Sequence, residues 1–504
     1  MYTFSTTVAR DAPASLTLND ITLDSAYSPK ADGGAILSSG PLTLNNVTIQ
    51  NSKAGLAFCG GAIRSDGLAI ITNSRFIKNA AGDGGAICTA AAGAPTLRIT
   101  NSSFNENQAT RTAPDAGVGG AILLKQTATL EVKGSTFFSN KADGGGALGI
   151  LESAMATARL EAGQKPAFLF NSATVSGGAI YNLGTLNVYG AEFNGNTVPE
   201  NALLNGYGGG IASQGVLTVH DSYFSVNRSR FGGGVFVGGN GNPQADIQRT
   251  IFSQNTAAVF GGGLYTNNED TLISVSNSIF RRNNAGTGGG LARFNEQLQL
   301  SNSSVTQNTA VGVGGGMYLG AGPSPGSSSY VKVRSVTIST NQAGNPGGGG
   351  VFNEGRAELY HVTIVNNPGG VYTGMDGNTR FRGSVLHNPG FPNCTSALNT
   401  QISNDAGNHI SDDSCGFQFT AAGDPKLGPL QSDGVNTLFY HMPLEGSPLI
   451  NMGPSNCPEI DQRGALRVGP CDIGAVEFGG VLQPGPPPTL PPIGQPVFLP
   501  IIVR

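Results

Sequence analysis

The sequence predicts an all-β fold, a single-stranded parallel β-helix of about 13 coils with a disulfide-stapled C-terminal cap. Three observations predict it: a recurring glycine cluster, an asparagine at a fixed distance after a bulky apolar residue, and short alternating runs between the two. The three recur together as one unit, so the period of that unit decides the fold class before any single motif does.

The glycine cluster sets the period. A glycine followed directly by an apolar residue marks thirteen positions, which span 336 residues (370 minus 34) in twelve intervals with a mean of 28. Runs such as residues 42–49 and 186–193 alternate apolar and polar residues, which is typical of strands. A propeller blade needs about 40 residues, and no period holds a glycine-free helical pattern. The marks are Gly34, Gly61, Gly85, Gly120, Gly146, Gly178, Gly210, Gly234, Gly263, Gly290, Gly316, Gly350 and Gly370.

An asparagine three positions after a bulky residue is the second landmark. In a stack of coils, equivalent positions lie about 4.8 Å apart, so the phenylalanines are expected to stack in the core and the asparagine amides to form a hydrogen-bonded ladder at a turn. The phenylalanine-led members are Asn79, Asn107, Asn140, Asn171, Asn196, Asn227, Asn255 and Asn283. Val305, Ile338, Ile364 and Val385 lead the same spacing further on.

Taken in order, the chain divides into four parts. Residues 1–32 are expected to form an incomplete first coil, 33–392 the stack, 393–478 a cap, and 479–504 a proline-rich linker with a short tail. The first residues lack the charged and apolar regions of a secretory signal. Because the run 16–23 already reads as a strand of the repeat, either the true N-terminus lies upstream, which we expect, or export uses another route.

The GGAI segments at 33–36, 60–63, 84–87, 119–122 and 177–180, paired with the Phe-x-x-Asn series, resemble the repeats of chlamydial polymorphic outer-membrane proteins. The same pairing is similar to that of many bacterial right-handed β-helix proteins with a pectin-lyase-like solenoid. The resemblance covers about residues 30–390. It implies the fold, whereas function varies widely on this architecture.

The C-terminal block resembles the choice-of-anchor Q domain of secreted bacterial β-helix proteins. DPKLGPL (424–430), GSPLIN (446–451), DQRGALR (461–467) and CDIGAVE (471–477) carry the resemblance, and Asn451 stands where that family more often has aspartate. The resemblance implies a surface or secreted protein. Independently, such a block would cover the open strand edges of the last coil, with Asp461, Arg463, Asp472 and Glu477 in buried ion pairs.

Six cysteines bear on the compartment. Cys394 with Cys415, and Cys457 with Cys471, each bracket a polar loop, which favours disulfides and an oxidising environment. Spacings of 21 and 14 without a Cys-x-x-Cys motif argue against zinc. Cys59 and Cys88 lie in neighbouring coils on opposite sides of the glycine mark, and we expect buried free thiols there.

Composition excludes some classes of function. Charged residues make up 12% of the chain and the formal net charge is −4, without a basic run, so a nucleic-acid partner is not expected. No apolar stretch is long enough to cross a membrane. An extracellular or cell-surface location, with polysaccharide or cell-envelope components as partners, fits the remaining features.

The candidate catalytic residues form one small cluster. Glu269 and Glu296 both lie six residues past a glycine mark, with Asp270 adjacent and Arg293 near. Stacked carboxylates could bind calcium or act as an acid/base pair on a sugar chain. Exposed charges at the rim of a loop explain the cluster equally well, and the same offset from Gly316 is Gly322, which interrupts the column. No other cofactor is expected.

The five histidines, His220, His361, His387, His409 and His441, share no metal-ligand spacing and are interpreted as neutral surface or turn residues. Three functions follow. The first is a non-enzymatic extracellular rod for adhesion or cell-envelope interaction. The second is a polysaccharide lyase or glycoside hydrolase acting along one face. The third is a structural stalk or self-assembling surface layer. Whether the chain is an enzyme stays open, with the balance against it.

Overall fold

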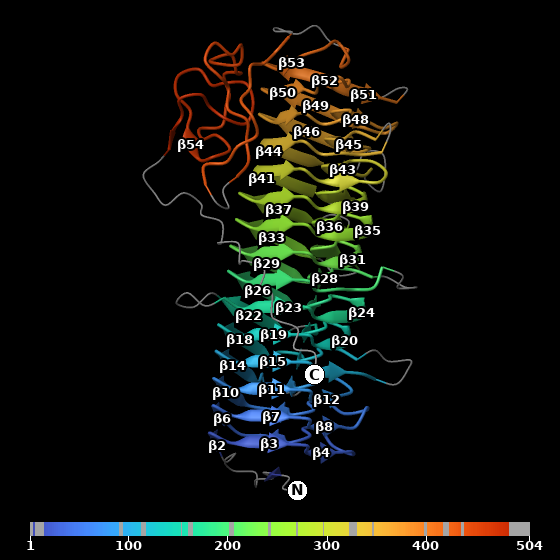
Figure 1. The fold of residues 1–504 in the computed structure, drawn as a ribbon, viewed down its shortest axis with the longest axis vertical. Coiled ribbons are helices and arrows are strands. Elements are labelled where there is room, and N and C mark those ends of the chain that lie inside the picture. Colours follow the sequence, from blue (N-terminus) through green and yellow to red (C-terminus); the bar gives the residue numbers. More distant parts are fainter. Residues whose placement is uncertain are drawn as a thin grey trace, which may run out of the picture.

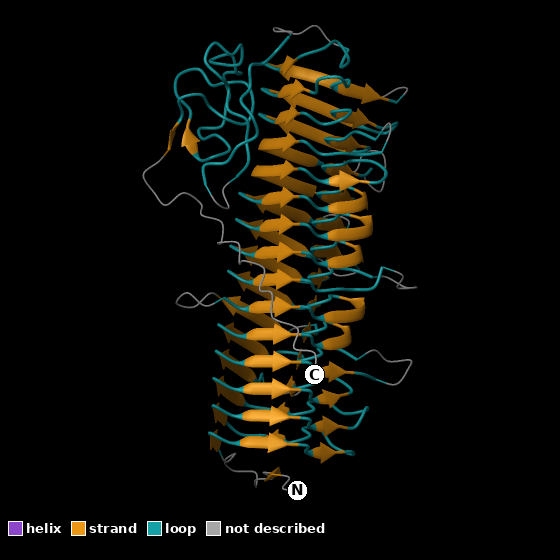
Figure 2. Ribbon diagram, in the orientation of Figure 1, coloured by secondary structure: helices purple, strands orange, loops and turns teal. Residues whose placement is uncertain are grey.

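The chain forms one long rod of stacked coils, with a further segment against the side of the rod near its C-terminal end (Figure 1). The computed structural model describes residues 4–5, 15–89, 94–111, 117–152, 154–159, 165–200, 206–239, 243–268, 271–295, 297–321, 330–344, 347–397, 401–416, 423–434 and 438–482. Throughout these ranges the secondary structure consists of strands and loops (Figure 2).

The first sheet has 15 parallel strands, one from each coil. All except the first and the last begin just after a glycine cluster, and neighbouring strands pair in register, so that Ile87 lies opposite Ile63 and Ile122. Its strands are β1 (Phe4–Ser5), β5 (Ile36–Ser38), β9 (Ile63–Ser65), β13 (Ile87–Thr89), β17 (Ile122–Leu124), β21 (Leu148–Ile150), β25 (Ile180–Asn182), β28 (Ile211–Ser213), β32 (Val235–Gly238), β36 (Leu264–Asn267), β40 (Leu291–Phe294), β43 (Met317–Leu319), β45 (Val351–Asn353), β48 (Val371–Thr373) and β51 (Cys394–Ser396).

The second sheet takes two strands from most coils, a longer one and then a shorter one. The longer strands alternate buried and solvent-facing residues, as in LAIIT of β10. They are β2 (Leu16–Asn19), β6 (Leu42–Asn45), β10 (Leu68–Thr72), β14 (Thr96–Thr100), β18 (Thr129–Lys133), β22 (Met155–Arg159), β26 (Thr185–Tyr189), β29 (Val216–His220), β33 (Gln244–Gln248), β37 (Leu272–Ser276), β46 (Arg356–Tyr360), β49 (Asn378–Arg382) and β52 (Gln401–Ala406).

In all but one of these coils the shorter strand follows the longer one after two residues, and the three-residue strands place their central residue in the core. They are β3 (Thr22–Asp24), β7 (Thr48–Gln50), β11 (Arg75–Ile77), β15 (Ser103–Asn105), β19 (Thr136–Phe138), β23 (Ala167–Leu169), β27 (Glu192–Asn194), β30 (Tyr223–Ser225), β34 (Ile251–Ser253), β38 (Ile279–Arg281), β47 (Thr363–Val365), β50 (Val385–His387) and β53 (His409–Ile410). In two coils the longer and shorter strands run together, as β41 (Gln297–Thr306) and β44 (Val331–Ser339).

The third side of the coil carries two separate sheets, of six and four strands. The first consists of β4 (Tyr27–Ser28), β8 (Lys53–Ala54), β12 (Ala80–Ala81), β16 (Gln108–Ala109), β20 (Lys141–Gly144) and β24 (Ser172–Ser176). The second consists of β31 (Arg228–Phe231), β35 (Thr256–Phe260), β39 (Asn284–Thr287) and β42 (Thr309–Ala310). A small antiparallel pair, β54 (Ala465–Leu466) with β55 (Val481–Leu482), lies outside the rod.

A column of stacked phenylalanine rings runs through the core. Phe224 is fully buried, and its ring centroid lies 4.5 Å from that of Phe193 and 5.1 Å from that of Phe252. Strand pairing sets this spacing, because each ring sits at the same register position one coil further on. The column contains Phe76, Phe104, Phe137, Phe168, Phe193, Phe224, Phe252 and Phe280.

The asparagines form a buried ladder at the turn that follows the shorter strands. The Asn255 side chain donates to the Phe224 carbonyl at 3.0 Å and to Oδ1 of Asn283 at 3.0 Å, and its own Oδ1 accepts from Asn227. Each asparagine thus supplies hydrogen bonds that the backbone of the turn cannot make. The same pattern joins Asn79, Asn107, Asn140, Asn171, Asn196, Asn227, Asn283, Asn308, Asn341 and Asn367.

The stack continues past residue 392, where the sequence suggested that the cap begins. Cys394 starts β51 in the first sheet, and β52 and β53 extend the second sheet as far as Ile410. Cys394 is bonded to Cys415, and both are buried with Ile410 in the main core. This disulfide holds residues 411–416 against the last coil.

The remaining C-terminal segment, residues 423–482, packs along the side of the rod rather than across its end (Figure 1). Leu438 packs on Ile251 and Ile279, and Leu449 packs on Val365. These contacts lie on the outer side of the shorter strands of the second sheet, over several coils. The predicted cap is therefore mainly a lateral cover, which buries an apolar face of the sheet.

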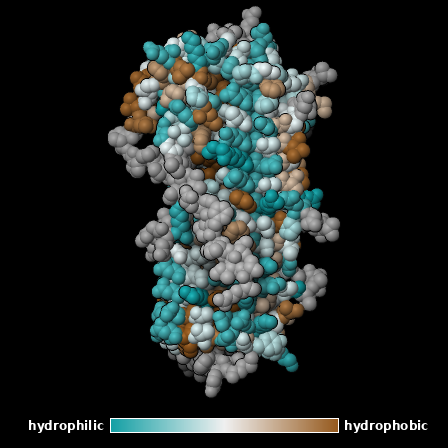
Figure 3. Space-filling model, in the orientation of Figure 1, coloured by the Kyte–Doolittle hydropathy of each residue, from teal (hydrophilic) through white to brown (hydrophobic). Residues whose placement is uncertain are grey.

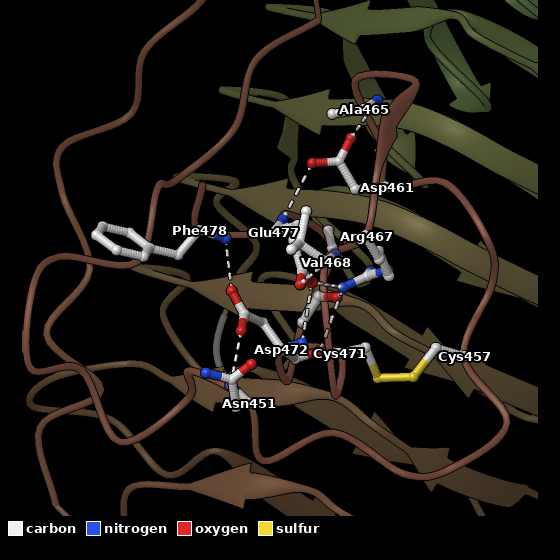
Figure 4. Close-up of polar contacts among 12 residues, drawn as sticks. Asn451, Cys457, Asp461, Ala465, Arg467, Val468, Cys471, Asp472, Glu477 and Phe478 are labelled. Carbon is white, nitrogen blue, oxygen red and sulfur yellow. Dashed lines mark hydrogen bonds and ion pairs between the residues drawn. A yellow bond between two sulfur atoms is a disulfide. The ribbon is translucent and has the colours of Figure 1, made fainter. Parts of the chain in front are cut away.

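A carboxylate network holds this C-terminal segment together (Figure 4). Asp461 pairs with Arg463 at 2.7 Å, whereas Glu477 pairs with Arg467 at 2.8 Å. Asp472, which the sequence predicts to form an ion pair, instead accepts backbone N–H groups from Asn451 and Phe478. Asp461 likewise accepts from the backbone of Ala465 and Glu477. The disulfide Cys457–Cys471 closes the same unit.

The expectation of free thiols at Cys59 and Cys88 is wrong, because the two form a disulfide with a Cα–Cα distance of 5.7 Å. The glycine pair between strand and turn reverses the chain. As a result, a residue just before one glycine pair lies beside the central residue of the first-sheet strand one coil further on, and both are packed outside the main core. Sequence offsets from the glycine mark did not reveal this proximity.

Candidate functional site

An aromatic strip runs along the outside of the first sheet and is separate from the main core. It uses the two outward positions that hold Cys59 and Cys88 nearer the N-terminal end. Val235 and Val237 face the core, so Phe236 between them faces outward, as Tyr265 does one coil further on. The strip consists of Tyr181, Tyr207, Phe231, Phe236, Phe260, Tyr265, Phe294, Tyr318, Phe352 and Tyr372.

The rings of this strip contact one another across several coils. Tyr207 lies 4.3 Å from Phe236 and 5.1 Å from Phe231, measured between ring centroids, and Phe352 lies 4.6 Å from Tyr372. Phe236 and Tyr265 are each 5% exposed, whereas Tyr207 and Phe231 are half-buried. The strip is consequently anchored by buried rings and flanked by partly accessible ones.

A cavity of about 420 Å³ opens beside the strip. Its described lining combines two aromatic rings with amide side chains and carries no charged residue. The lining residues are Tyr207, Gln214, Phe236, Gly239, Asn267, Asn268 and Asn295. Aromatic and apolar walls with a few polar groups are typical of small-molecule and sugar sites.

The amide groups present both donors and acceptors to this cavity. Gln214 Nε2 donates to the Tyr181 hydroxyl at 3.2 Å, and Asn295 Nδ2 lies 3.4 Å from Asn267 Oδ1. Burial raises the pKa of the Tyr181 phenol, which therefore stays protonated at neutral pH. Such a lining suits a neutral ligand rich in hydroxyl groups.

A carboxylate contacts the strip at Tyr318. The Tyr318 hydroxyl donates a short hydrogen bond to Glu354. Burial and the neighbouring Glu354 carboxylate both raise the pKa of the Tyr318 phenol. Tyr318 is thus a neutral donor that holds Glu354 against the strip.

The predicted catalytic cluster is only partly described. Glu269, Asp270 and Glu296 lie outside the described residues, although their chain neighbours Asn268 and Asn295 line the cavity. Arg293 is not on a rim: its side chain is fully buried, and Nη1 donates to the Gly320 carbonyl at 2.8 Å. It occupies an inward position of β40, opposite Thr266 and Leu319, and its expected proximity to the three carboxylates falls outside the described residues.

The histidines agree only in part with the prediction of surface or turn residues: His361 does lie in a turn, but three of the five are buried. His220 lies on the longer strands and contacts Asp246 at 2.9 Å. His361, His409 and His441 are buried, and His387 is half-buried; these four lie where the C-terminal segment meets the rod. Three of these four histidines belong to the rod and His441 belongs to the C-terminal segment, so their spacing in the sequence did not indicate that they lie close together.

The described ranges contain no group of three or more His, Cys, Asp or Glu side chains arranged to hold a metal ion. Nor does any helix there have the length and apolar character needed to cross a membrane.

Residues 210–386 match the family described as "Right handed beta helix region". No curated protein matches the chain by sequence. Among solved structures, the periplasmic alginate epimerase AlgG is similar over 79% of this chain and 85% of its own, with 10% identity and a TM-score of 0.35. Two point mutants of that enzyme, with 10% and 11% identity, give TM-scores of 0.30 and 0.31. The fold is a right-handed parallel β-helix.

Sequence reasoning missed the aromatic strip, although a signal was present. An aromatic residue stands two positions after the glycine mark at Phe236, Tyr265, Tyr318, Phe352 and Tyr372, and directly before a glycine cluster at Tyr207, Phe231 and Phe260. The two series become one surface only when the turn brings them together.

Proposed function

We propose that this protein is a non-enzymatic extracellular rod that adheres to neutral glycan chains, such as those of a cell envelope. The single observation that carries the proposal is the cavity of amide side chains beside the aromatic strip. Pyranose rings offer apolar C–H faces to aromatic rings and hydroxyl edges to amides, and both partners are present here. Three disulfides support an oxidising compartment.

The rod geometry favours an extended ligand. Equivalent positions on successive coils are spaced by about 4.8 Å, so ring and amide contacts recur along the rod axis in Tyr207, Phe236 and Tyr265. A linear glycan laid parallel to this axis would meet several coils at once. Affinity would then rise with chain length, as expected for repeated weak contacts.

The test is retention of the full chain on immobilised neutral and acidic glycans, followed by calorimetry with oligomers of increasing length. We expect Gln214→Ala and Asn267→Ala to weaken binding of neutral oligomers by about tenfold, since each removes a hydrogen-bonding amide. Gln299→Ala, at an exposed position on a longer strand of the second sheet, is the matched control. Equal binding by all four proteins would reject the cavity as the site.

A second candidate is a polysaccharide lyase or hydrolase, because Glu269 and Glu296 directly follow the cavity residues Asn268 and Asn295 in the sequence. Incubation with a polysaccharide panel, with and without calcium, would reveal new reducing ends or unsaturated products. Turnover lost in Glu269→Gln or Glu296→Gln would establish the enzyme. Neither turnover nor retention would leave the third candidate, a structural stalk or surface layer.

A further inference from the structure

Four of the five histidines gather at one junction, between the C-terminal segment and the rod. His387 lies on β50 and His409 on β53, at positions that face the segment, and His361 lies in the turn that precedes β47. His441 comes from the segment itself and reaches the rod at Ser339. The junction therefore concentrates the residue type that changes charge nearest neutral pH.

His441 and His409 make hydrogen bonds across or beside this junction. One nitrogen of His441 lies 2.9 Å from Ser339 Oγ, and the other lies 2.8 Å from the Gly428 carbonyl, which requires a proton on that nitrogen. His409 Nε2 donates to the Gly423 carbonyl at 2.9 Å. A neutral imidazole satisfies each of these contacts.

His361 has the least favourable surroundings for a charge. It is 1% exposed, and neither ring nitrogen has a hydrogen-bond partner among the described residues. Arg334 and Arg382 from the rod and Arg467 from the segment are the charged groups that act on it. The segment is fixed beside it by a hydrogen bond of 2.7 Å from the Gly474 amide to the Gly383 carbonyl.

His387 and His409 have a milder environment. Asp424 from the segment acts on both of them, and Asp412 acts on His387. These carboxylates favour the charged imidazole, whereas burial opposes it and prevails at both residues. Their Nδ1 atoms lack hydrogen-bond partners in the described part of the chain.

We propose that this junction is a pH-operated latch: residues 423–482 stay docked while the four histidines are neutral, and leave the side of the rod as a unit when they are charged. A buried imidazolium beside arginines has no compensating partner, so undocking relieves its cost. The Cys457–Cys471 disulfide and the Asp461 and Glu477 ion pairs keep the released segment together. Release uncovers Ile251, Ile279 and Val385.

The direction of the pH effect follows from the pKa shifts. Burial lowers the pKa of all four histidines, and burial with the three arginines lowers that of His361 to about 3. Docking is thus fully favoured above the ordinary histidine pKa of about 6.5 and is lost as pH falls from there toward 3. At pH 4.5, protonation of His361 therefore favours the undocked state, in which the segment and its Arg467 no longer lie beside the ring.

Hydrogen exchange on the full chain at pH 7.5 and 4.5, corrected for intrinsic rates, tests the latch. We expect amides of the C-terminal segment to lose protection at pH 4.5 while the first sheet keeps it. A hydrophobic dye should bind to the uncovered residues Ile251, Ile279 and Val385 at pH 4.5 but not at pH 7.5. Segment protection that is unchanged between the two pH values, or loss of protection in rod and segment together, would overturn the proposal.

Variants identify the groups responsible. His361→Asn suits the turn, because Asn277 occupies the equivalent position with the same positive φ, and His441→Gln keeps an amide between Ser339 and Gly428. The double variant should retain segment protection at pH 4.5, whereas His220→Gln should behave as the unsubstituted protein. If the double variant is already undocked at pH 7.5, the single variant His361→Asn is used instead, and it too should retain segment protection at pH 4.5. If the segment of His361→Asn is released with the same pH dependence as in the unsubstituted protein, His361 does not control docking.

Discussion

At the scale of single residues, asparagine and glycine hold neighbouring coils together. Asn255 Nδ2 donates to a carbonyl of its preceding coil and to the amide oxygen of Asn283 in the next. Gly262 allows close contact between coils because it has no side chain: a Cβ there would lie 2.3 Å from the Gly289 carbonyl oxygen. The asparagines and glycines that recur in the sequence are therefore the residues that contact neighbouring coils.

Asn255→Ala should destabilise the central coils by about 3 kcal/mol, because buried backbone and side-chain groups of the ladder lose their partners. Urea unfolding and hydrogen exchange of the flanking coils would measure the loss. Asn45→Ala, which removes an exposed amide hydrogen-bonded to Asn19, is the control and should cost well under 1 kcal/mol. Equal effects would show that burial of the ladder is not what matters.

Gly262→Ala should destabilise the rod by about 2 kcal/mol, since the added methyl group forces neighbouring backbones apart. The same substitution at Gly144 is the matched comparison, because the nearest atom to its Cβ would be a Tyr181 ring carbon at 3.4 Å. Thermal unfolding of the two variants measures the difference. A similar melting temperature for both would refute the close-approach argument.

At the scale of elements, strand register turns single residues into columns. The same pairing that stacks Phe224 on Phe193 and Phe252 inside the rod aligns Phe236 with Tyr265 outside it. Alternation along each strand assigns the two columns to opposite faces. One repeat thus builds both the core and the candidate binding strip.

Phe224→Ala should cost about 4 kcal/mol, because it removes a fully buried ring and leaves a cavity in the stacked column. Phe224→Leu should cost less, as it keeps most of the volume. Chemical denaturation would rank the two variants, and coils far from residue 224 should keep their exchange protection, since coils interact mainly with their neighbours. A uniform loss along the whole rod would contradict this local view.

At the scale of the whole molecule, the C-terminal segment covers the shorter strands of the second sheet where their outward residues are apolar or small. At one register position on five successive coils, the residues are Glu192, Tyr223, Ile251, Ile279 and Ser304. In the space-filling view, hydrophobic side chains also gather on the outside of the segment (Figure 3). Two hydrophobic residues of the segment, Met452 and Val468, are more than half exposed.

Ile279→Asp should detach the segment at neutral pH, because it places an unpaired carboxylate against Leu438 in a buried contact. Limited proteolysis within residues 423–482 and a larger radius of gyration would report release, while the sheets remain intact. Ile70→Asp, at an outward position on β10 far from the segment, is the control. A segment that stays docked in Ile279→Asp would contradict the importance of this apolar contact.

Much of this architecture was predictable from the repeat alone. Equivalent residues such as Phe224 and Phe252, or Asn227 and Asn255, recur at one coil's length, and parallel pairing forces them into contact. The candidate site was less predictable. Phe236 and Tyr207 lie 29 residues apart in the sequence (236 minus 207), at different positions of the repeat, and meet because neighbouring coils stack.

The sequence by itself determined the coil, its period, its core column and its asparagine ladder, because these contacts join like residues at a constant spacing. Only the tertiary structure revealed the features that the repeat does not predict. These are the Cys59–Cys88 disulfide, the burial of Arg293, and the packing of the C-terminal segment against the side of the rod at four histidines. These features involve positions that are not equivalent within the repeat, or residues from separate elements. Only the folded chain brings them within reach of each other.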